Sequence, residues 1–289
     1  MSISQGLAHD TETKKTKTEL PKKYEEYKTV FEKKASECFP VKKPWDHAIN
    51  LKSDFILKDC RIYPMSPGEQ EKLDKFINEN FCKKYIRLSK FPQASPFFFI
   101  SKKDSGKLRP CQDYWRLNDW TIKNAYPLPH VGNLLDKLKG AKYYTKFDLR
   151  WGYNNVRIKE GDEWKAAFKM NKGLFEPTVM FFGLCNLPST FQNMMNDISK
   201  DKINEGWLLI YMDDILVFTN DHSKMEEYMK RVLQKLHDNN LFLNLNKYVF
   251  DVTEVEYLGL IIKENKITME PTKLAGIADW PAPTTVKQV

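Results

Sequence analysis

The segment 207–218 is a run of apolar and aromatic residues that only two adjacent aspartates, Asp213 and Asp214, interrupt. Burying an ionised carboxylate without a partner costs on the order of several kcal/mol. Neighbouring side chains of one strand point to opposite faces, so a continuous strand would turn one aspartate into the core. The conflict disappears if residues 211–214 form the turn of a β-hairpin, which places both carboxylates at the edge of a sheet.

Carboxylates crowded at one sheet edge repel each other unless a cation lies between them. A hard divalent ion with oxygen ligands relieves this repulsion, and magnesium is the usual ion beside phosphates. The alternative is an ordinary polar hairpin turn, because Asp is a favoured turn residue. The long apolar approach over 207–212, which contains neither glycine nor asparagine, favours the metal hypothesis.

A third carboxylate, Asp148, ends the segment 143–148, whose alternation predicts a second strand. If the hairpin lies beside this strand, Asp148 comes close to Asp213. Three carboxylates can hold two ions roughly 3.5–4 Å apart, the arrangement used for in-line phosphoryl or nucleotidyl transfer. Taken alone, Asp148 fits a cap or turn bond at the end of a strand better than a metal site.

The order of elements along the chain predicts an α+β fold. The strand over 143–148 is expected to pair with 155–159, and helical spacing predicts a helix over 188–203. After the hairpin, a capping box of Ser223 and Glu226 predicts the start of another helix. Strand, helix, hairpin, helix, strand is the split βαβ (ferredoxin-like) pattern, a sheet with helices on one face.

Two further elements are expected before this unit. Ser66 and Glu69 form a capping box with Pro67 at the first helical position, which predicts a helix. Residues 96–109 are typical of a strand, a tight turn and a returning strand rich in Lys and Arg. By itself, such a basic hairpin fits a solvated turn better than a phosphate-binding site.

The composition divides the 289 residues into a linker and one folded region. Residues 1–44 are rich in Lys, Thr and Glu and poor in apolar residues, which predicts a flexible linker, and 45–289 is the expected domain. No apolar run approaches the roughly 20 residues of a membrane span, and no signal segment is present, so an intracellular protein without membrane contact is expected. The five scattered cysteines predict neither disulfides nor a zinc site.

The formal net charge of +8 favours a polyanionic partner, since neutralisation of phosphates supplies most non-specific affinity for nucleic acids. Many basic proteins bind no nucleic acid, so this is a weak indication.

The chain resembles the reverse transcriptases of gypsy-type LTR retrotransposon Pol polyproteins, and its particular variants resemble fungal elements. The resemblance covers roughly residues 90–280 in the expected order and spacing. Its most specific motifs are Tyr211-Met212-Asp213-Asp214 between apolar strands and the segment 147–156 around Asp148. The other matching segments are 126–129, 173–177, 182–184, 187–192 and 256–260.

The resemblance implies a right-hand polymerase with a split βαβ palm and a fingers subdomain, and with a thumb that starts at about residue 263 and is truncated. It implies that Asp148, Asp213 and Asp214 are the catalytic residues and bind two Mg²⁺ ions, for which Mn²⁺ is a substitute. It also implies that Lys102 and Arg109 of the basic hairpin grip the triphosphate of the incoming nucleotide, in agreement with the preference of Lys and Arg for phosphate.

Further roles are implied by the same motifs. Tyr153 matches the aromatic gate that excludes a ribose 2′-hydroxyl, although without the resemblance it is simply a core aromatic. Gly183 matches a position that lines the nucleotide pocket, and Leu258 and Gly259 match the primer grip, where glycine allows close approach of nucleic acid. Lys247 matches a lysine that donates a proton to pyrophosphate.

The chain departs from the family pattern at three positions. Trp115 stands where arginine is usual, Tyr248 where cysteine is common, and Leu245 where proline is common. The first departure is expected to weaken contacts that organise the fingers.

The function implied by the resemblance is RNA-directed DNA polymerisation, in which a DNA primer is extended from dNTPs on an RNA or DNA template by two-metal nucleotidyl transfer. The implied partners are the RNA template, the DNA primer and their RNA–DNA hybrid. Cytoplasmic particles and later the nucleus are the implied location. One alternative is a truncated or domesticated, non-catalytic fragment that binds nucleic acid. Another is a palm polymerase that copies RNA into RNA, against which a bulky gate at Tyr153 argues.

Overall fold

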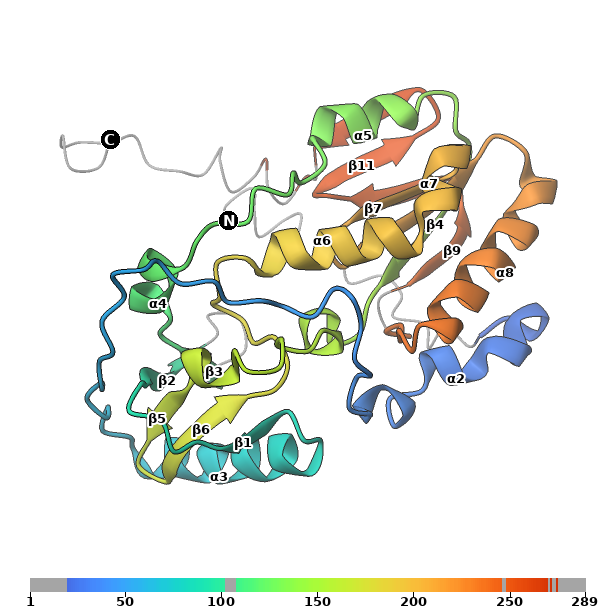
Figure 1. Ribbon diagram of the computed structural model, residues 1–289. Coiled ribbons are helices and arrows are strands. Elements are labelled where there is room, and N and C mark those ends of the chain that lie inside the picture. The colour runs from blue at the N-terminus through green and yellow to red at the C-terminus, as the bar shows by residue number, and fades with distance from the viewer. Residues whose placement is uncertain (1–19, 102–107, 246–247, 270, 272–273, 275–289) are drawn as a thin grey trace, which may run out of the picture.

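The predicted split βαβ unit is built on an antiparallel four-stranded sheet of order β7-β8-β4-β9, here called the palm sheet. The computed structural model describes residues 20–101, 108–245, 248–269, 271 and 274. Figure 1 shows two long helices, α6 and α8, on one side of the palm sheet. The elements of the unit are β4 (Tyr143–Asp148), α6 (Leu187–Ile198), α7 (Lys200–Glu205), β7 (Leu208–Tyr211), β8 (Asp214–Thr219), α8 (His222–Asp238) and β9 (Val249–Val252).

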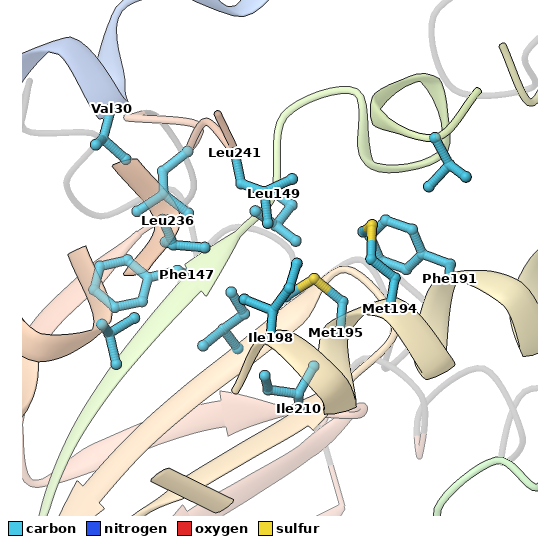
Figure 2. Packing of buried hydrophobic residues seen from close by; sticks show 14 of the residues in the cluster. Val30, Phe147, Leu149, Phe191, Met194, Met195, Ile198, Ile210, Leu236 and Leu241 are labelled. Atoms are coloured by element: carbon cyan, nitrogen blue, oxygen red, sulfur yellow. The ribbon is translucent and has the colours of Figure 1, made fainter. Parts of the chain in front are cut away.

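The two faces of the palm sheet bury different clusters, because side chains alternate along each strand. One face contributes Phe147, Val217 and Ile210 to the main core, where they pack with α6 and α8. Figure 2 shows Phe147 and Ile210 among the methionines of α6 and the end of α8. The opposite face contributes Tyr144 and Leu216 to a smaller cluster. The register places Asp148 and Asp214 on the side of this smaller cluster.

The smaller cluster is covered by a three-stranded sheet and a short helix rather than by a long helix. Leu134 comes from the helix, and Tyr257 and Ile262 come from the sheet, whose strand order is β10-β11-β12. The predicted placement of helices on one face therefore holds for α6 and α8. The covering elements are α5 (Val131–Lys137), β10 (Glu254–Tyr257), β11 (Leu260–Lys263) and β12 (Lys266–Met269).

A mixed five-stranded sheet of order β1-β6-β5-β2-β3, here called the fingers sheet, lies beside the palm unit (Figure 1). The expected basic hairpin is present as the antiparallel pair of β2 and β3. The predicted helix begins behind Ser66 with the complete capping box. The elements of this part are α3 (Pro67–Cys82), β1 (Ile86–Leu88), β2 (Ser95–Ser101), β3 (Leu108–Gln112), α4 (Trp115–Trp120), η4 (Glu163–Ala166), β5 (Phe168–Met170) and β6 (Gly173–Pro177).

Residues 20–44, which the sequence predicts to belong to a flexible linker, are instead packed against the palm unit. Tyr24, Val30 and Phe31 are 2%, 1% and 1% exposed and belong to the main core. These three side chains pack together beside α8 and Tyr248, and this is enough to attach the segment to the core. The composition of residues 1–44 did not reveal these three core residues, because many lysines and glutamates surround them in the sequence. This segment forms η1 (Lys22–Tyr27), α2 (Lys28–Phe31) and η2 (Ala35–Glu37).

Two local predictions are wrong. Residues 155–159 are not the hairpin partner of β4, which pairs with β8 and β9; the left-handed Trp151 and the 3-10 helix η3 (Gly152–Asn155) turn the chain away. The helix α8 is capped by Asp221, two residues before the expected Ser223, because the side chain of Asp221 accepts a hydrogen bond from the Ser223 N–H. Among the described residues, no helix is both long and apolar enough to cross a membrane.

Candidate active site

The hairpin predicted around the two aspartates is formed by β7 and β8. Tyr211 pairs with Asp214, so Met212 and Asp213 are the two residues of the turn. Met212 adopts a left-handed conformation with φ of 56°, which a short hairpin turn favours and a side chain resists. The turn therefore brings Asp213 and Asp214 to the end of the palm sheet, as expected.

The side chain of Gln192, on α6, holds this turn by two hydrogen bonds. Its side-chain oxygen accepts a hydrogen bond from the Met212 N–H at 2.8 Å, and its amide nitrogen donates to the Ile210 carbonyl at 3.1 Å. Gln192 is fully buried, and leaving such groups unsatisfied costs about 1–3 kcal/mol. The sequence placed Gln192 in a family motif without giving it a role, and a glutamine inside an apolar helix face was the available signal.

Asp148 and Asp214 lie directly opposite each other on the neighbouring strands β4 and β8. Paired residues of antiparallel strands place their side chains on the same face. The backbone ties the third aspartate to the same place, because the Leu149 N–H donates to the Asp213 carbonyl at 3.1 Å. The structure thus brings the three predicted residues to one end of the palm sheet.

Lys146 contributes a positive charge beside these carboxylates. Its Nζ lies 3.1 Å from Oδ1 of Asp214, and the two side chains are 19% and 30% exposed. Lys146 stands two residues before Asp148 on β4, so both side chains share a face of the sheet. Lys146 has no role predicted from the sequence, although a lysine between the aromatic residues of a strand was a usable signal.

Gly152 leaves room for the carboxylate of Asp213. A Cβ atom built on Gly152 would overlap Oδ1 of Asp213 and would lie 2.8 Å from its Cγ. The carboxylate therefore packs directly on the glycine backbone. The neighbouring turn is held by Asn155, whose amide nitrogen donates to the carbonyls of Arg150 and Trp151.

Tyr153, the predicted gate, lies beside the same carboxylate. Burial, followed by the negative charge of Asp213, raises the pKa of Tyr153 to about 12. Its ring makes edge contacts with Phe182 and Phe191, with centroids 5.1 and 5.4 Å apart. Phe182 is 69% exposed, so this aromatic pair reaches from the core to the surface. Phe182 belongs to the matching segment 182–184, but no role was predicted for it from the sequence.

Gly183 lies where the loop after Phe182 meets the fingers. Its φ is +105°, and a Cβ atom would lie 3.2 Å from both the Gln112 carbonyl oxygen and a ring carbon of Tyr114. Asn118 of α4 fixes the loop, because its amide nitrogen donates to the Gly183 carbonyl at 2.7 Å. Its side-chain oxygen accepts from the Cys185 N–H at 2.9 Å.

Leu258 and Gly259 form the turn between β10 and β11. Their φ angles are 53° and 75°, and Tyr257 pairs with Leu260 across the turn. Two left-handed residues are typical of a tight hairpin turn. Burial, followed by the negative charge of Asp214, raises the pKa of Tyr257. Tyr257 packs in the smaller cluster with Tyr144 and Leu216, so this hairpin lies on the face of the palm sheet that bears Asp214.

Arg109 lies in the fingers sheet rather than in the palm sheet that carries the aspartates. Arg109 is exposed on β3 and pairs with Ile100 in the fingers sheet. Lys102 and Lys247 lie outside the described residues.

The three aspartates fit a divalent metal by chemistry, because all their donor atoms are carboxylate oxygens, which magnesium prefers. Their backbones converge at one end of the palm sheet. Within the part of the chain that the structure describes, however, no three His, Cys, Asp or Glu side chains are gathered closely enough to hold one ion. The cation next to Asp214 in this structure is the Lys146 ammonium group.

The palm and fingers sheets and the three aspartates at one end of the palm sheet define the class to which this protein belongs. Residues 100–262 match the family model described as reverse transcriptase (RNA-dependent DNA polymerase), and the chain belongs to that family. Members of the family generally use divalent metal ions.

The chain is also similar to longer curated proteins. The Transposon Tf2-3 and Tf2-7 polyproteins of Schizosaccharomyces pombe are each 34% identical to it over 272 residues, which is 94% of this chain. The chain spans 20% of the length of these relatives.

Solved structures of a foamy viral protease-reverse transcriptase share the fold. The complex with an RNA/DNA hybrid has a TM-score of 0.78 at 20% identity, covering 92% of this chain and 35% of that chain. A form in complex with double-stranded DNA has a TM-score of 0.81 at 21% identity, covering 92% and 46%. The expected palm and fingers architecture is therefore confirmed.

Proposed function

We propose that this chain catalyses RNA-directed DNA synthesis, extending a DNA primer on an RNA or DNA template from dNTPs. The observation that carries the proposal is the pairing of Asp148 on β4 with Asp214 on β8, with Asp213 in the turn between β7 and β8. Membership of the reverse transcriptase family supports it. The similar polyproteins support assignment to a gypsy-type retrotransposon of fungal type.

Asp148, Asp213 and Asp214 would hold two Mg²⁺ ions, with Mn²⁺ as a substitute. When bound, these ions would activate the primer 3′-hydroxyl and neutralise charge on the leaving pyrophosphate. The protein's own residues would position the reactants. Tyr153 would present its ring to the sugar and exclude a 2′-hydroxyl.

The nucleic-acid partners would be an RNA template, a DNA primer and their hybrid. The foamy viral relatives bind an RNA/DNA hybrid and double-stranded DNA, and the net charge of +8 suits a polyanion. Arg109 and Lys102 would grip the triphosphate, Gly183 would line the nucleotide pocket, and Leu258 and Gly259 would contact the primer. Lys247 would donate a proton to pyrophosphate. Cytoplasmic particles, and later the nucleus, are the proposed location.

The test is incorporation of deoxynucleotides on a poly(rA)/oligo(dT) primer–template, with and without Mg²⁺. Wild-type chain should be active, and Asp213→Asn should lose activity by several orders of magnitude while unfolding at the same temperature. Asp238→Asn is the matched control, because Asp238 is an exposed aspartate at the end of α8. Full activity in Asp213→Asn would overturn the mechanism. Salt-sensitive template binding without synthesis by the wild type would favour the non-catalytic alternative.

A further inference from the structure

Trp151 adopts a backbone conformation that a large side chain rarely takes. Its φ and ψ are 55° and 35°, in the left-handed region. A residue other than glycine keeps this conformation only where neighbouring groups hold it there. Trp151 directly precedes Gly152, against whose backbone the Asp213 carboxylate packs. The conformation of Trp151 therefore decides where that backbone lies.

Two side chains hold Trp151 in place. The amide nitrogen of Asn155 donates to the Trp151 carbonyl at 3.3 Å. The Nζ of Lys83 lies over the indole ring, 5.2 Å from its centroid. A cation in this position is attracted by the negative face of the ring, and tryptophan is the strongest partner among the aromatic residues. Asn155 thus holds the backbone of the turn, and Lys83 holds the side chain.

Lys83 comes from the fingers rather than from the palm. It ends α3, where its backbone N–H donates to the Glu79 carbonyl. Its Nζ also lies 3.2 Å from Oε1 of Glu37, and the two side chains are 19% and 34% exposed. The ammonium group therefore contacts both a carboxylate and an aromatic ring, and water screens these contacts only in part.

Glu37 is itself fixed, because the N-terminal segment is attached to the fold on both sides of it. Before Glu37, the buried side chain of Phe31 belongs to the main core. After it, Phe39 packs against the apolar cluster of the fingers. A fixed carboxylate restricts the Lys83 ammonium to the place where it meets Trp151.

We propose that Lys83 is a positioning residue of the candidate active site. Paired with Glu37, its ammonium group holds Trp151 in the left-handed conformation and so keeps the Gly152 backbone against the Asp213 carboxylate. The effect on the turn follows from these contacts alone, and its consequence for DNA synthesis rests on the proposed function. The N-terminal segment, α3 and the turn after β4 thus act as one unit.

The first measurement is hydrogen–deuterium exchange by mass spectrometry on the full chain, without metal or nucleic acid. The Leu149, Arg150 and Val156 N–H groups donate to backbone carbonyls, so exchange in peptides that cover 149–156 reports opening of the turn. Lys83→Ala should speed this exchange by about 2- to 5-fold, the factor that corresponds to one cation–π contact. Lys83→Arg should exchange like the wild type, because a guanidinium group also stacks on tryptophan and pairs with a carboxylate.

Lys172→Ala is the matched control. Lys172 pairs with Asp74 of the same helix at 3.2 Å, so its replacement removes one ion pair between α3 and the fingers sheet and leaves Lys83 and Trp151 in place. This variant should exchange like the wild type over 149–156.

The second measurement is deoxynucleotide incorporation by the same variants. Lys83→Ala should lower kcat by roughly 10-fold, since a small displacement of a reacting group is costly in rate. KM for the primer–template and the melting temperature should stay near the wild-type values, and Lys83→Arg should restore kcat. A role confined to stability would instead lower the melting temperature and leave kcat of the folded protein unchanged.

Unchanged exchange over 149–156 in Lys83→Ala, or an equal increase in Lys172→Ala, would overturn the positioning role. Faster exchange that leaves kcat unchanged would overturn it as well. Because the exchange measurement requires no catalysis, it separates the two proposals. Faster exchange in Lys83→Ala, in a protein whose wild type synthesises no DNA, would keep the effect of Lys83 on the turn and remove the polymerase assignment.

Discussion

The ammonium nitrogen of Lys146 lies 3.1 Å from a carboxylate oxygen of Asp214, the residue that pairs with Asp148 across the palm sheet. Lysine here compensates a negative charge at the place where the proposed function requires a metal ion. Both side chains are less than one third exposed, so the pair is only partly screened by water.

Replacing Lys146 with Ala should lower the free energy of unfolding by about 1 kcal/mol in metal-free buffer, since Asp214 loses its compensating charge. Added Mg²⁺ should raise the melting temperature of the variant more than that of the wild type. Lys142→Ala is the matched control, because Lys142 forms a more exposed pair with Glu264. Thermal unfolding with and without Mg²⁺ checks this; an equal Mg²⁺ effect in all three chains contradicts it.

Gly152→Ala should displace the Asp213 carboxylate, because the added methyl group would occupy its position. A displacement of about 1 Å costs on the order of 100-fold in rate. The loss should fall on kcat for deoxynucleotide incorporation, with the melting temperature nearly unchanged. Gly68→Ala provides the control, since nothing lies within 4 Å of a Cβ atom there. A wild-type kcat in Gly152→Ala would show that catalysis does not require the Asp213 carboxylate at this position.

His47 should make the protein sensitive to mild acid. It is 2% exposed, its Nδ1 lies 2.9 Å from Oγ1 of Thr190, and burial lowers its pKa to about 4 against an opposing effect of Asp162. The unfolded chain binds a proton near pH 6.5, so stability is complete above that pH and falls as pH drops toward 4. The expected loss is about 3 kcal/mol.

Denaturant unfolding between pH 7 and pH 4 measures this dependence. His47→Asn should be less stable at pH 7 and should show a smaller decrease over the same range. An unchanged decrease in that variant would assign the acid sensitivity to other groups.

Phe31→Ala should destabilise the fold by about 3–5 kcal/mol, because the side chain is buried in the main core. A flexible linker would show no such effect. Phe81→Ala is a suitable comparison, since Phe81 is 41% exposed on α3. Urea unfolding of the two variants distinguishes them, and equal stabilities would mean that residues 20–44 do not contribute to the core in solution.

The interrupted apolar run at 207–218 was sufficient to predict the hairpin and the position of Asp213 and Asp214, because burying a charge allows few solutions. The alternation of 143–148 likewise predicted β4. From the sequence, Asp148 could be predicted only to lie near Asp213. Its pairing with Asp214 could be known only from the register between β4 and β8. Periodicity does not encode register between strands that are distant in sequence.

The sequence by itself determined the α+β class, the order of the palm elements and the acidic residues at their ends, since local patterns of apolar and charged residues fix these. Only the tertiary structure decided that Lys146 compensates Asp214, that Gly152 makes room for Asp213, that Gln192 holds the turn and that Phe31 belongs to the core. Each of these depends on which side chains meet across elements, and that is settled by packing of the whole chain rather than by any single segment.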